Sequence, residues 1–154
     1  MDSQTRVDAV YTDFSKAFDK INHNILISKL SEIGVHGNLL RWLTSYVFNR
    51  SQLVTISGYK SPPYVAKSGV PQGSHLGPLL FLIYINDIRH CFKFCKFLLY
   101  ADDLKIYSQI NNSDNCIAYQ EDLNSFFEYC KLNKLQLNLS KCFYICFTRN
   151  QNIY

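Results

Sequence analysis

The sequence predicts an α+β or α/β fold with a largely antiparallel sheet. Apolar segments with strand period and helix period alternate along the chain. An acidic turn joins two short apolar segments as in a hairpin, and the last apolar segment alternates residue by residue. The chain has 154 residues, of which 47% are hydrophobic, enough for the core of one domain. No segment has the composition of a linker.

The first half of the chain predicts a strand, two helices and a second strand. The first strand covers residues 7–12 and ends at Asp13. Asn22 is placed to cap a helix that Gly34 stops, and a second helix covers 38–48. A β-branched strand over 53–57 ends before the breaker Pro62-Pro63. The expected apolar faces are Leu26, Leu30 and Ile33 on the first helix and Leu39, Leu43 and Tyr46 on the second.

The second half predicts a loop, two helices, a hairpin and a closing strand. A turn-rich loop over 68–74 leads into a buried helix over 78–89, where Pro78 suits the first turn. The hairpin joins 97–99 to 104–107, and Ser113 or Asp114 caps a long helix. Residues 136–139 are extended. The expected apolar stripe of the long helix is Cys116, Tyr119, Leu123, Phe126 and Cys130, and the closing strand alternates Phe143, Ile145 and Phe147 with Cys142, Tyr144 and Cys146.

The six cysteines favour a reducing compartment over a disulfide framework. Two pairs of cysteines have CxxxC spacing: Cys91 with Cys95, and Cys142 with Cys146. Zinc sites usually contain the shorter CxxC spacing. We therefore expect buried apolar thiols, and a zinc site is the alternative. The polar start has no signal-peptide pattern, and the apolar run over 78–85 is too short for a membrane span. We therefore expect an intracellular protein, in the cytoplasm or nucleus rather than secreted.

The acidic turn Tyr100-Ala101-Asp102-Asp103 is the first candidate site. Two adjacent carboxylates repel each other, and a divalent cation removes that repulsion. If the strand ending at Asp13 lies beside the hairpin, three carboxylates meet and suit two Mg²⁺ ions about 4 Å apart. The alternatives are a solvent-exposed Asp turn and, for Asp13 or Asp19, an anion at a helix start, which fits Asp19 better.

Four segments in order resemble the palm motifs of a reverse transcriptase of the non-LTR (LINE-type) retrotransposon group. They are residues 13–26, residues 68–87, the YADD turn at 100–103, and residues 138–141. Together they span nearly the whole chain. The residues of the first two motifs resemble those of non-LTR elements more than those of retroviral and group II intron enzymes. The resemblance implies an α+β palm whose mainly antiparallel sheet carries the catalytic hairpin and packs on helices.

The resemblance also implies roles for individual residues. Asp13, Asp102 and Asp103, with the backbone carbonyl of Phe14, would hold Mg²⁺, or Mn²⁺ in its place. Lys141 would face the triphosphate and could protonate the leaving group; a lone surface lysine is the alternative. Phe18 would exclude a 2′-hydroxyl, with core packing as the alternative. The expected nucleotide-binding residues are Ala17, Phe18, Gln72, Gly73 and Tyr100, although Pro71-Gln72-Gly73 is also an ordinary turn pattern.

The implied partners are an RNA template, a DNA primer and a dNTP. We interpret residues 1–154 as a partial reverse transcriptase domain, a palm core with fingers mostly missing and thumb missing, completed by the remaining regions of a longer polyprotein. The net charge of +4 permits a polyanion partner without demanding one. The alternatives are a catalytically inactive nucleic-acid-binding remnant and a palm-like nucleotide cyclase. An RNA-dependent RNA polymerase is disfavoured by Phe18.

Overall fold

The computed structural model describes residues 6–148, and the chain divides into two compact units. The first unit combines the residues up to Ser15 with those from Asp87 onward, and the second is Lys16–Asn86. Helices and strands follow one another along the chain, and every strand pair within residues 6–148 is antiparallel. Of the two fold classes left open by the sequence, the α+β class is therefore confirmed.

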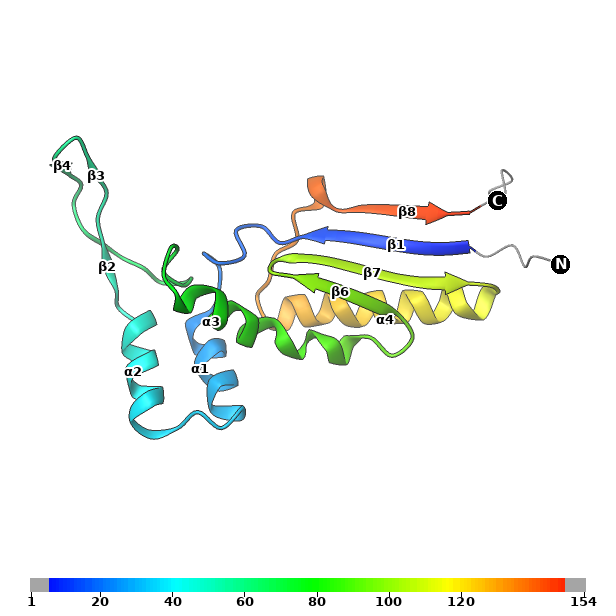
Figure 1. The fold of residues 1–154 in the computed structure, drawn as a ribbon, viewed down its shortest axis with the longest axis horizontal. Helices are drawn as coiled ribbons and strands as arrows, with labels where there is room; N and C mark the ends of the chain where they lie inside the picture. The colour runs from blue at the N-terminus through cyan, green and yellow to red at the C-terminus, as the bar shows by residue number, and fades with distance from the viewer. Residues whose placement is uncertain (1–5, 149–154) are drawn as a thin grey trace. The chain divides into compact units, whose positions relative to one another are not determined.

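The first unit is built on a four-stranded sheet of order β6-β7-β1-β8, in which every neighbouring pair is antiparallel (Figure 1). The central strand β1, which the sequence predicts, ends at Asp13. β6 and β7 form the predicted hairpin, and β8 is the predicted closing strand. The strand bounds are Arg6–Asp13 for β1, Lys96–Tyr100 for β6, Asp103–Ile110 for β7 and Phe143–Phe147 for β8.

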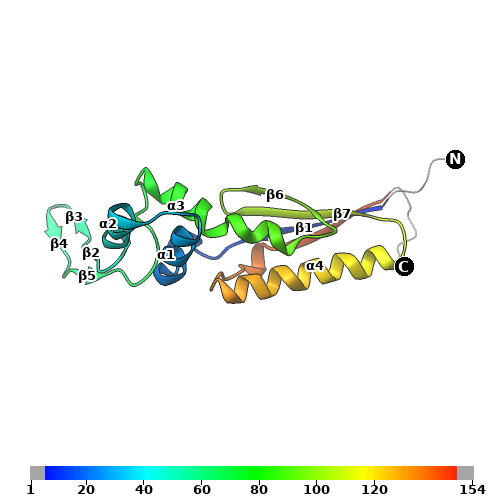
Figure 2. The same cartoon turned by 90° about the horizontal axis from the view of Figure 1, so that it is seen from below.

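Helix α4, Ser113–Leu132, runs along one face of this sheet (Figures 1 and 2). Alternate residues of β7, Leu104, Ile106 and Ile110, are buried as a half-buried strand requires. The Tyr119 hydroxyl of α4 donates to the Ile106 carbonyl at 3.3 Å, and burial raises the pKa of this phenol. The buried face of the sheet therefore packs on α4.

Two expectations for α4 are wrong. Asn112, and neither Ser113 nor Asp114, caps the helix, because its side chain accepts from the Asn115 backbone N–H. Cys116 is exposed, because the buried stripe begins one turn later at Tyr119 and continues through Phe126 and Cys130.

The second unit contains three helices: α1 (His23–Glu32), α2 (Gly37–Val47) and α3 (Leu76–Ile85). The Asn22 side chain caps α1 by accepting from the Ile25 backbone N–H at 3.2 Å, and Gly34 follows the helix with a φ of +95°. Both features agree with the sequence prediction. Leu26 and Leu30 are buried, but Ile33 and Leu39 are exposed, so these two were wrongly assigned to apolar faces; on α2 the buried residues are Leu43 and Val47.

The single strand predicted over 53–57 is confirmed only at Thr55–Ile56. Four two-residue strands take its place: β2 (Ser51–Gln52) pairs with β5 (Tyr64–Val65), and β3 (Thr55–Ile56) pairs with β4 (Tyr59–Lys60). Ser57 and Gly58 both have positive φ, 49° and 85°, as a two-residue type I′ hairpin turn requires. This turn lies at the predicted end of the strand, and the strand that returns from it, Tyr59–Lys60, was not predicted.

Helix α3 begins two residues earlier than predicted and stops at Ile85, after which a 3₁₀ turn, η1 (Asn86–Cys91), continues the chain. Pro78 lies in the first turn of α3 as expected. A second 3₁₀ turn, η2 (Leu139–Lys141), precedes β8. Within residues 6–148, no helix combines the length and apolar character needed to cross a membrane.

All six cysteines are unpaired thiols. Cys91, Cys95 and Cys130 are buried, which agrees with the expectation of apolar thiols. Burial raises the pKa of Cys95 and of Cys130 to about 12. Both side chains are therefore neutral in the metal-free protein and pack as part of the core.

Candidate active site

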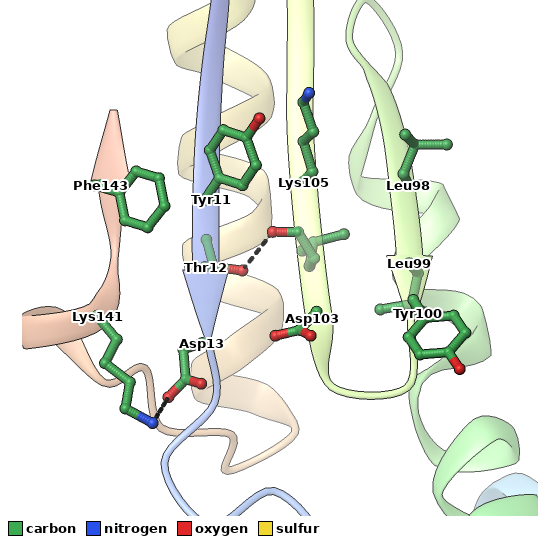
Figure 3. A pocket seen from close by; sticks show the side chains of 11 residues that line it. Tyr11, Thr12, Asp13, Leu98, Leu99, Tyr100, Asp103, Lys105, Lys141 and Phe143 are labelled. Carbon is green, nitrogen blue, oxygen red and sulfur yellow. Dashed lines mark hydrogen bonds and ion pairs between the residues drawn. The ribbon is translucent and has the colours of Figure 1, made fainter. Parts of the chain in front are cut away.

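Asp13 and Asp103 lie directly opposite each other across the β1–β7 ladder. Asp13 is the last residue of β1 and Asp103 is the first of β7, so both occupy the end of the sheet at the hairpin turn. Figure 3 shows the Asp103 carboxylate directed toward Asp13. Directly opposed residues have Cβ atoms about 4.5–5.5 Å apart. The register therefore places two negative charges within the reach of one cation.

Lys141 is the cation that the chain itself places beside this pair. Its Nζ lies 3.6 Å from Asp13 Oδ2 (Figure 3). The Lys141 side chain is 65% exposed and that of Asp13 is 24% exposed, so solvent weakens this ion pair. The η2 turn brings the lysine here, because the Asn138 backbone N–H donates to the Asp13 carbonyl at 2.8 Å.

Asp13, Asp103 and Lys141 open onto a pocket of about 720 Å³ on the face of the sheet opposite α4. Tyr100, 84% exposed, lies at its edge. Deeper along the strands the lining is apolar and aromatic: Tyr11 and Phe143 stack with ring centroids 4.9 Å apart, and Lys105 Nζ lies 4.9 Å from the Tyr11 ring centroid. The pocket thus combines an acidic end with an aromatic floor (Figure 3).

Asp102 occupies the bend of the hairpin and is not among the residues that line this pocket. In residues 6–148, no group of three or more His, Cys, Asp or Glu side chains gathers closely enough to hold a metal. The structure thus brings Asp13 and Asp103 together without Asp102. Two carboxylates still fit Mg²⁺, which usually binds one or two protein carboxylates and completes its shell with water and substrate phosphate.

Phe14, whose backbone carbonyl was expected at the metal, follows Asp13 and forms an isolated bridge with Leu137. Its side chain is buried and meets the Phe126 ring edge-on with centroids 6.3 Å apart. Next to it, the Ser15 backbone N–H donates to the Gln136 carbonyl at 2.7 Å. These contacts fix the path of the backbone as it leaves β1.

The other predicted nucleotide-binding residues belong to the second unit. The loop 68–72 is tied to the segment 18–23 by several hydrogen bonds. The Val70 backbone N–H donates to the Phe18 carbonyl at 2.9 Å, and the Gln72 amide donates to Asp19 Oδ1 at 2.8 Å. The chain therefore holds its first two motif segments side by side.

The second unit also tests the packing alternatives for these residues. Ala17 is buried, and the half-buried Phe18 ring packs on Phe81 with centroids 4.6 Å apart, so Phe18 has a packing role in addition to any role at a sugar. Gly73 has a φ of +76°, and a Cβ there would meet open space. The positive φ of Gly73 therefore favours glycine, and a lack of space for a side chain does not.

Sequence reasoning missed two residues that hold the loop. A Cβ on Gly69 would lie 2.7 Å from the Asp19 carbonyl oxygen. The buried His23 ring hydrogen-bonds to the Gly69 carbonyl through Nε2 at 2.7 Å. The available clue was the His immediately after the helix cap Asn22, since a histidine in an apolar context needs a polar partner.

The antiparallel sheet with its acidic hairpin defines a palm-like domain, and comparison with known proteins gives the family. A family model described as "Reverse transcriptase (RNA-dependent DNA polymerase)" matches residues 4–152. The chain belongs to this family. This leaves the nucleotide cyclase alternative without support.

The relatives come from transposable elements. The chain is 34% identical over 155 residues to "Probable RNA-directed DNA polymerase from transposon BS" of Drosophila melanogaster, covering 96% of the chain and 17% of that protein. It is 29% identical over 150 residues to the RNA-directed DNA polymerase from mobile element jockey of Drosophila funebris, covering 90% of the chain and 16% of the relative. These relatives confirm the relationship to non-LTR retrotransposons that the motif residues indicate. The chain spans only about one sixth of the length of these curated relatives.

Among solved structures, the chain resembles apo telomerase from Candida tropicalis truncated from its C-terminal domain. The TM-score is 0.70 at 17% sequence identity, over 96% of this chain and 32% of the telomerase. At this identity the likeness establishes the fold, which confirms the expected α+β palm architecture.

Proposed function

We propose that residues 1–154 form the palm of an RNA-directed DNA polymerase that joins a dNTP to the 3′-hydroxyl of a DNA primer paired with an RNA template. The observation that carries the proposal is the cross-strand pairing of Asp13 with Asp103 at the mouth of one pocket. Membership of the reverse transcriptase family supports it. Fingers and thumb of a longer polyprotein would complete the enzyme, as the length of the relatives suggests.

Asp13 and Asp103 would hold the metal ions, with Asp102 and the Phe14 carbonyl as the further ligands that a second ion needs. Two Mg²⁺ ions, or Mn²⁺ in their place, would polarise the primer hydroxyl and neutralise the triphosphate when bound. Lys141, at 3.6 Å from Asp13, would donate a proton to the departing pyrophosphate. The aromatic floor with Lys105 offers apolar and cationic surface for the primer–template next to the acids.

In the second unit, Phe18 would limit the space for a 2′-hydroxyl, while Ala17, Gln72 and Gly73 would line the pocket for the nucleotide base and sugar. Tyr100, on the first unit, is the other residue that we assign to nucleotide binding. The Gln72–Asp19 hydrogen bond supports this part of the proposal, because it holds the Gln72 side chain in one position.

Metal binding by the full chain tests the carboxylate assignment without requiring turnover. We expect Mn²⁺ titration, followed by electron paramagnetic resonance, to show a site that Asp13→Asn and Asp103→Asn each weaken at least tenfold. Glu121→Gln on α4, an exposed acid outside the pocket, is the matched control. Equal Mn²⁺ affinity in all variants would contradict the assignment.

Primer extension on an RNA template then tests the activity. We expect incorporation by residues 1–154 alone to be weak or absent, because they span only about one sixth of the length of the related polymerases. Any incorporation should prefer dNTP over NTP, vanish in Asp13→Asn and lose sugar preference in Phe18→Ala. RNA binding with neither metal binding nor incorporation would instead favour a catalytically inactive nucleic-acid-binding remnant.

A further inference from the structure

A second polar groove, of about 690 Å³, lies wholly within the second unit and has no part in the metal chemistry. Its walls come from the β2–β5 ladder and the loop 66–72. The charged side chains that line it are Arg50, Lys67 and Asp19. The Asp19 carboxylate already accepts the Gln72 amide at 2.8 Å. The groove therefore has two cationic side chains and one carboxylate, and that carboxylate is already hydrogen-bonded to Gln72.

Arg50 is the unusual member of this groove. Its Nε is sheltered from solvent and has no hydrogen-bond partner among the residues that the structure describes. A buried donor without an acceptor costs about 1–3 kcal/mol, so a bound acceptor would stabilise this conformation. The backbone keeps Arg50 in place, because its carbonyl accepts from the Ala66 N–H at 2.9 Å. Lys67 directly follows Ala66 in the chain and lines the same groove.

The rest of the groove suits a phosphate group. The Tyr64 hydroxyl donates to Gln52 Oε1 at 2.7 Å, which leaves the Gln52 amide N–H groups as further donors. Tyr64 is 52% exposed as a residue, and an exposed aromatic ring can stack on a base. A guanidinium fork matches the geometry of phosphate oxygens. An arginine, a lysine, an amide and an exposed aromatic ring favour a nucleotide phosphate over a peptide carboxylate.

We propose that this Arg50–Lys67 groove binds a phosphate group of a nucleic acid or nucleotide. The phosphate could belong to a single-stranded RNA backbone or to a free nucleotide. The proposal does not depend on Asp13 or Asp103, since all the groove residues lie in the second unit.

Binding of labelled single-stranded RNA to the full chain, measured by fluorescence anisotropy in EDTA, tests this site apart from the metal chemistry. We expect Arg50→Gln and Lys67→Gln each to weaken binding several-fold. Each lost phosphate contact should also make the log–log salt dependence shallower by about 0.7. Arg50→Gln could disturb the fold. Because Lys67 is exposed, Lys67→Gln should leave the fold intact and tests the groove independently.

Lys60→Gln is the matched control, because Lys60 lies on the same segment of short strands, is exposed and does not line the groove. Competition with tripolyphosphate distinguishes the two sources: displacement of RNA through Arg50 and Lys67 indicates a nucleotide phosphate, and its absence indicates the backbone. The proposal is overturned if Lys60→Gln weakens RNA binding as much as the groove variants do, or if poly-glutamate displaces the labelled RNA as well as unlabelled RNA does. It is also overturned if neither Arg50→Gln nor Lys67→Gln changes the binding of RNA or tripolyphosphate. Loss of RNA binding in Asp103→Asn would count against it as well.

Discussion

Asp13 at the end of β1 and Asp103 at the start of β7 are direct antiparallel partners, with their carboxylates at the mouth of one pocket. Like charges directly opposite each other destabilise a β-ladder. The surface ion pair of Lys141 with Asp13 compensates only in part, because the lysine is 65% exposed. The protein thus keeps an unfavourable pair where a cation would make it favourable.

This relationship predicts opposite effects of Asp103→Asn with and without metal. In EDTA the substitution should raise the free energy of unfolding by up to about 1 kcal/mol, because it removes the cross-strand repulsion. In Mg²⁺ the wild type should gain stability by ligand linkage, and the variant should gain much less. Urea unfolding in both buffers measures this.

Glu121→Gln, an exposed acid on α4, serves as the control and should respond equally in both buffers. Destabilisation of Asp103→Asn in EDTA would show that the opposed carboxylates do not repel as inferred.

A buried carboxylate on α4 gives the second prediction. Asp122 is buried and accepts backbone N–H groups of Lys93, Phe94 and Cys95 at 2.7–3.1 Å, which anchors the turn before β6. Burial pushes the pKa of Asp122 up, but these hydrogen bonds outweigh burial and hold the pKa below its ordinary value. Asp122→Asn should therefore cost about 1.5–3 kcal/mol, as lost hydrogen bonds to a charged group do.

The pH dependence follows from the lowered pKa. The stabilisation is present above the unfolded-state pKa of about 3.9 and is lost as pH falls through the lower folded-state value. Urea unfolding between neutral and acidic pH should show less acid sensitivity in Asp122→Asn than in wild type. Asp114→Asn, in the exposed first turn of α4, is the control; the same loss of acid sensitivity there would contradict the assignment to Asp122.

Local patterns predicted the elements of this fold better than the contacts between them. The strand ending at Asp13 and the YADD hairpin follow from apolar alternation, and their pairing is what brings Asp13 opposite Asp103. The burial of Asp122 could not be predicted in this way, because its partners lie 27–29 residues away along the chain. The strand Tyr59–Lys60, which returns from the turn at Ser57-Gly58, was missed because two residues are too few to show a strand period.

The candidate site was predicted only in part for the same reason. Adjacent residues of a strand point to opposite faces, so a pair of neighbouring acids cannot be assumed to share a pocket. The structure places Asp103 in the lining and leaves Asp102 at the bend. The three-acid metal centre accordingly stays a prediction.

The hairpin turn itself supplies the third prediction. Ala101 has a φ of 52°, a left-handed conformation that costs a residue with a Cβ about 1–2 kcal/mol. Ala101→Gly should raise the free energy of unfolding by up to about 1 kcal/mol, since glycine adopts this conformation freely. Ala101→Val should lower it, because β-branched residues tolerate positive φ least.

Chemical denaturation of both variants checks this prediction. Ala118→Gly, inside α4, is the control and should be destabilising by about 1 kcal/mol. If glycine destabilised the turn and the helix equally, the inferred backbone strain at Ala101 would be absent.

Two glycines of the same loop give the last prediction, because they have similar φ values and different surroundings. Gly69 has a φ of +82° and no room for a Cβ, which would lie 2.7 Å from the Asp19 carbonyl oxygen; Gly73 has a φ of +76° and open space. Gly73→Ala should cost only the left-handed conformation, about 1–2 kcal/mol. Gly69→Ala should cost more, because it also pushes the loop away from Asp19 and strains the His23 hydrogen bond.

Thermal unfolding compares the two alanine variants, and hydrogen exchange at the Gly69 and Val70 amides, which donate to the Ile21 and Phe18 carbonyls, reports on the loop directly. We expect faster exchange at Val70 in Gly69→Ala and little change in Gly73→Ala. Equal destabilisation by both substitutions would mean that conformation alone, and not the close approach to Asp19, requires glycine at residue 69.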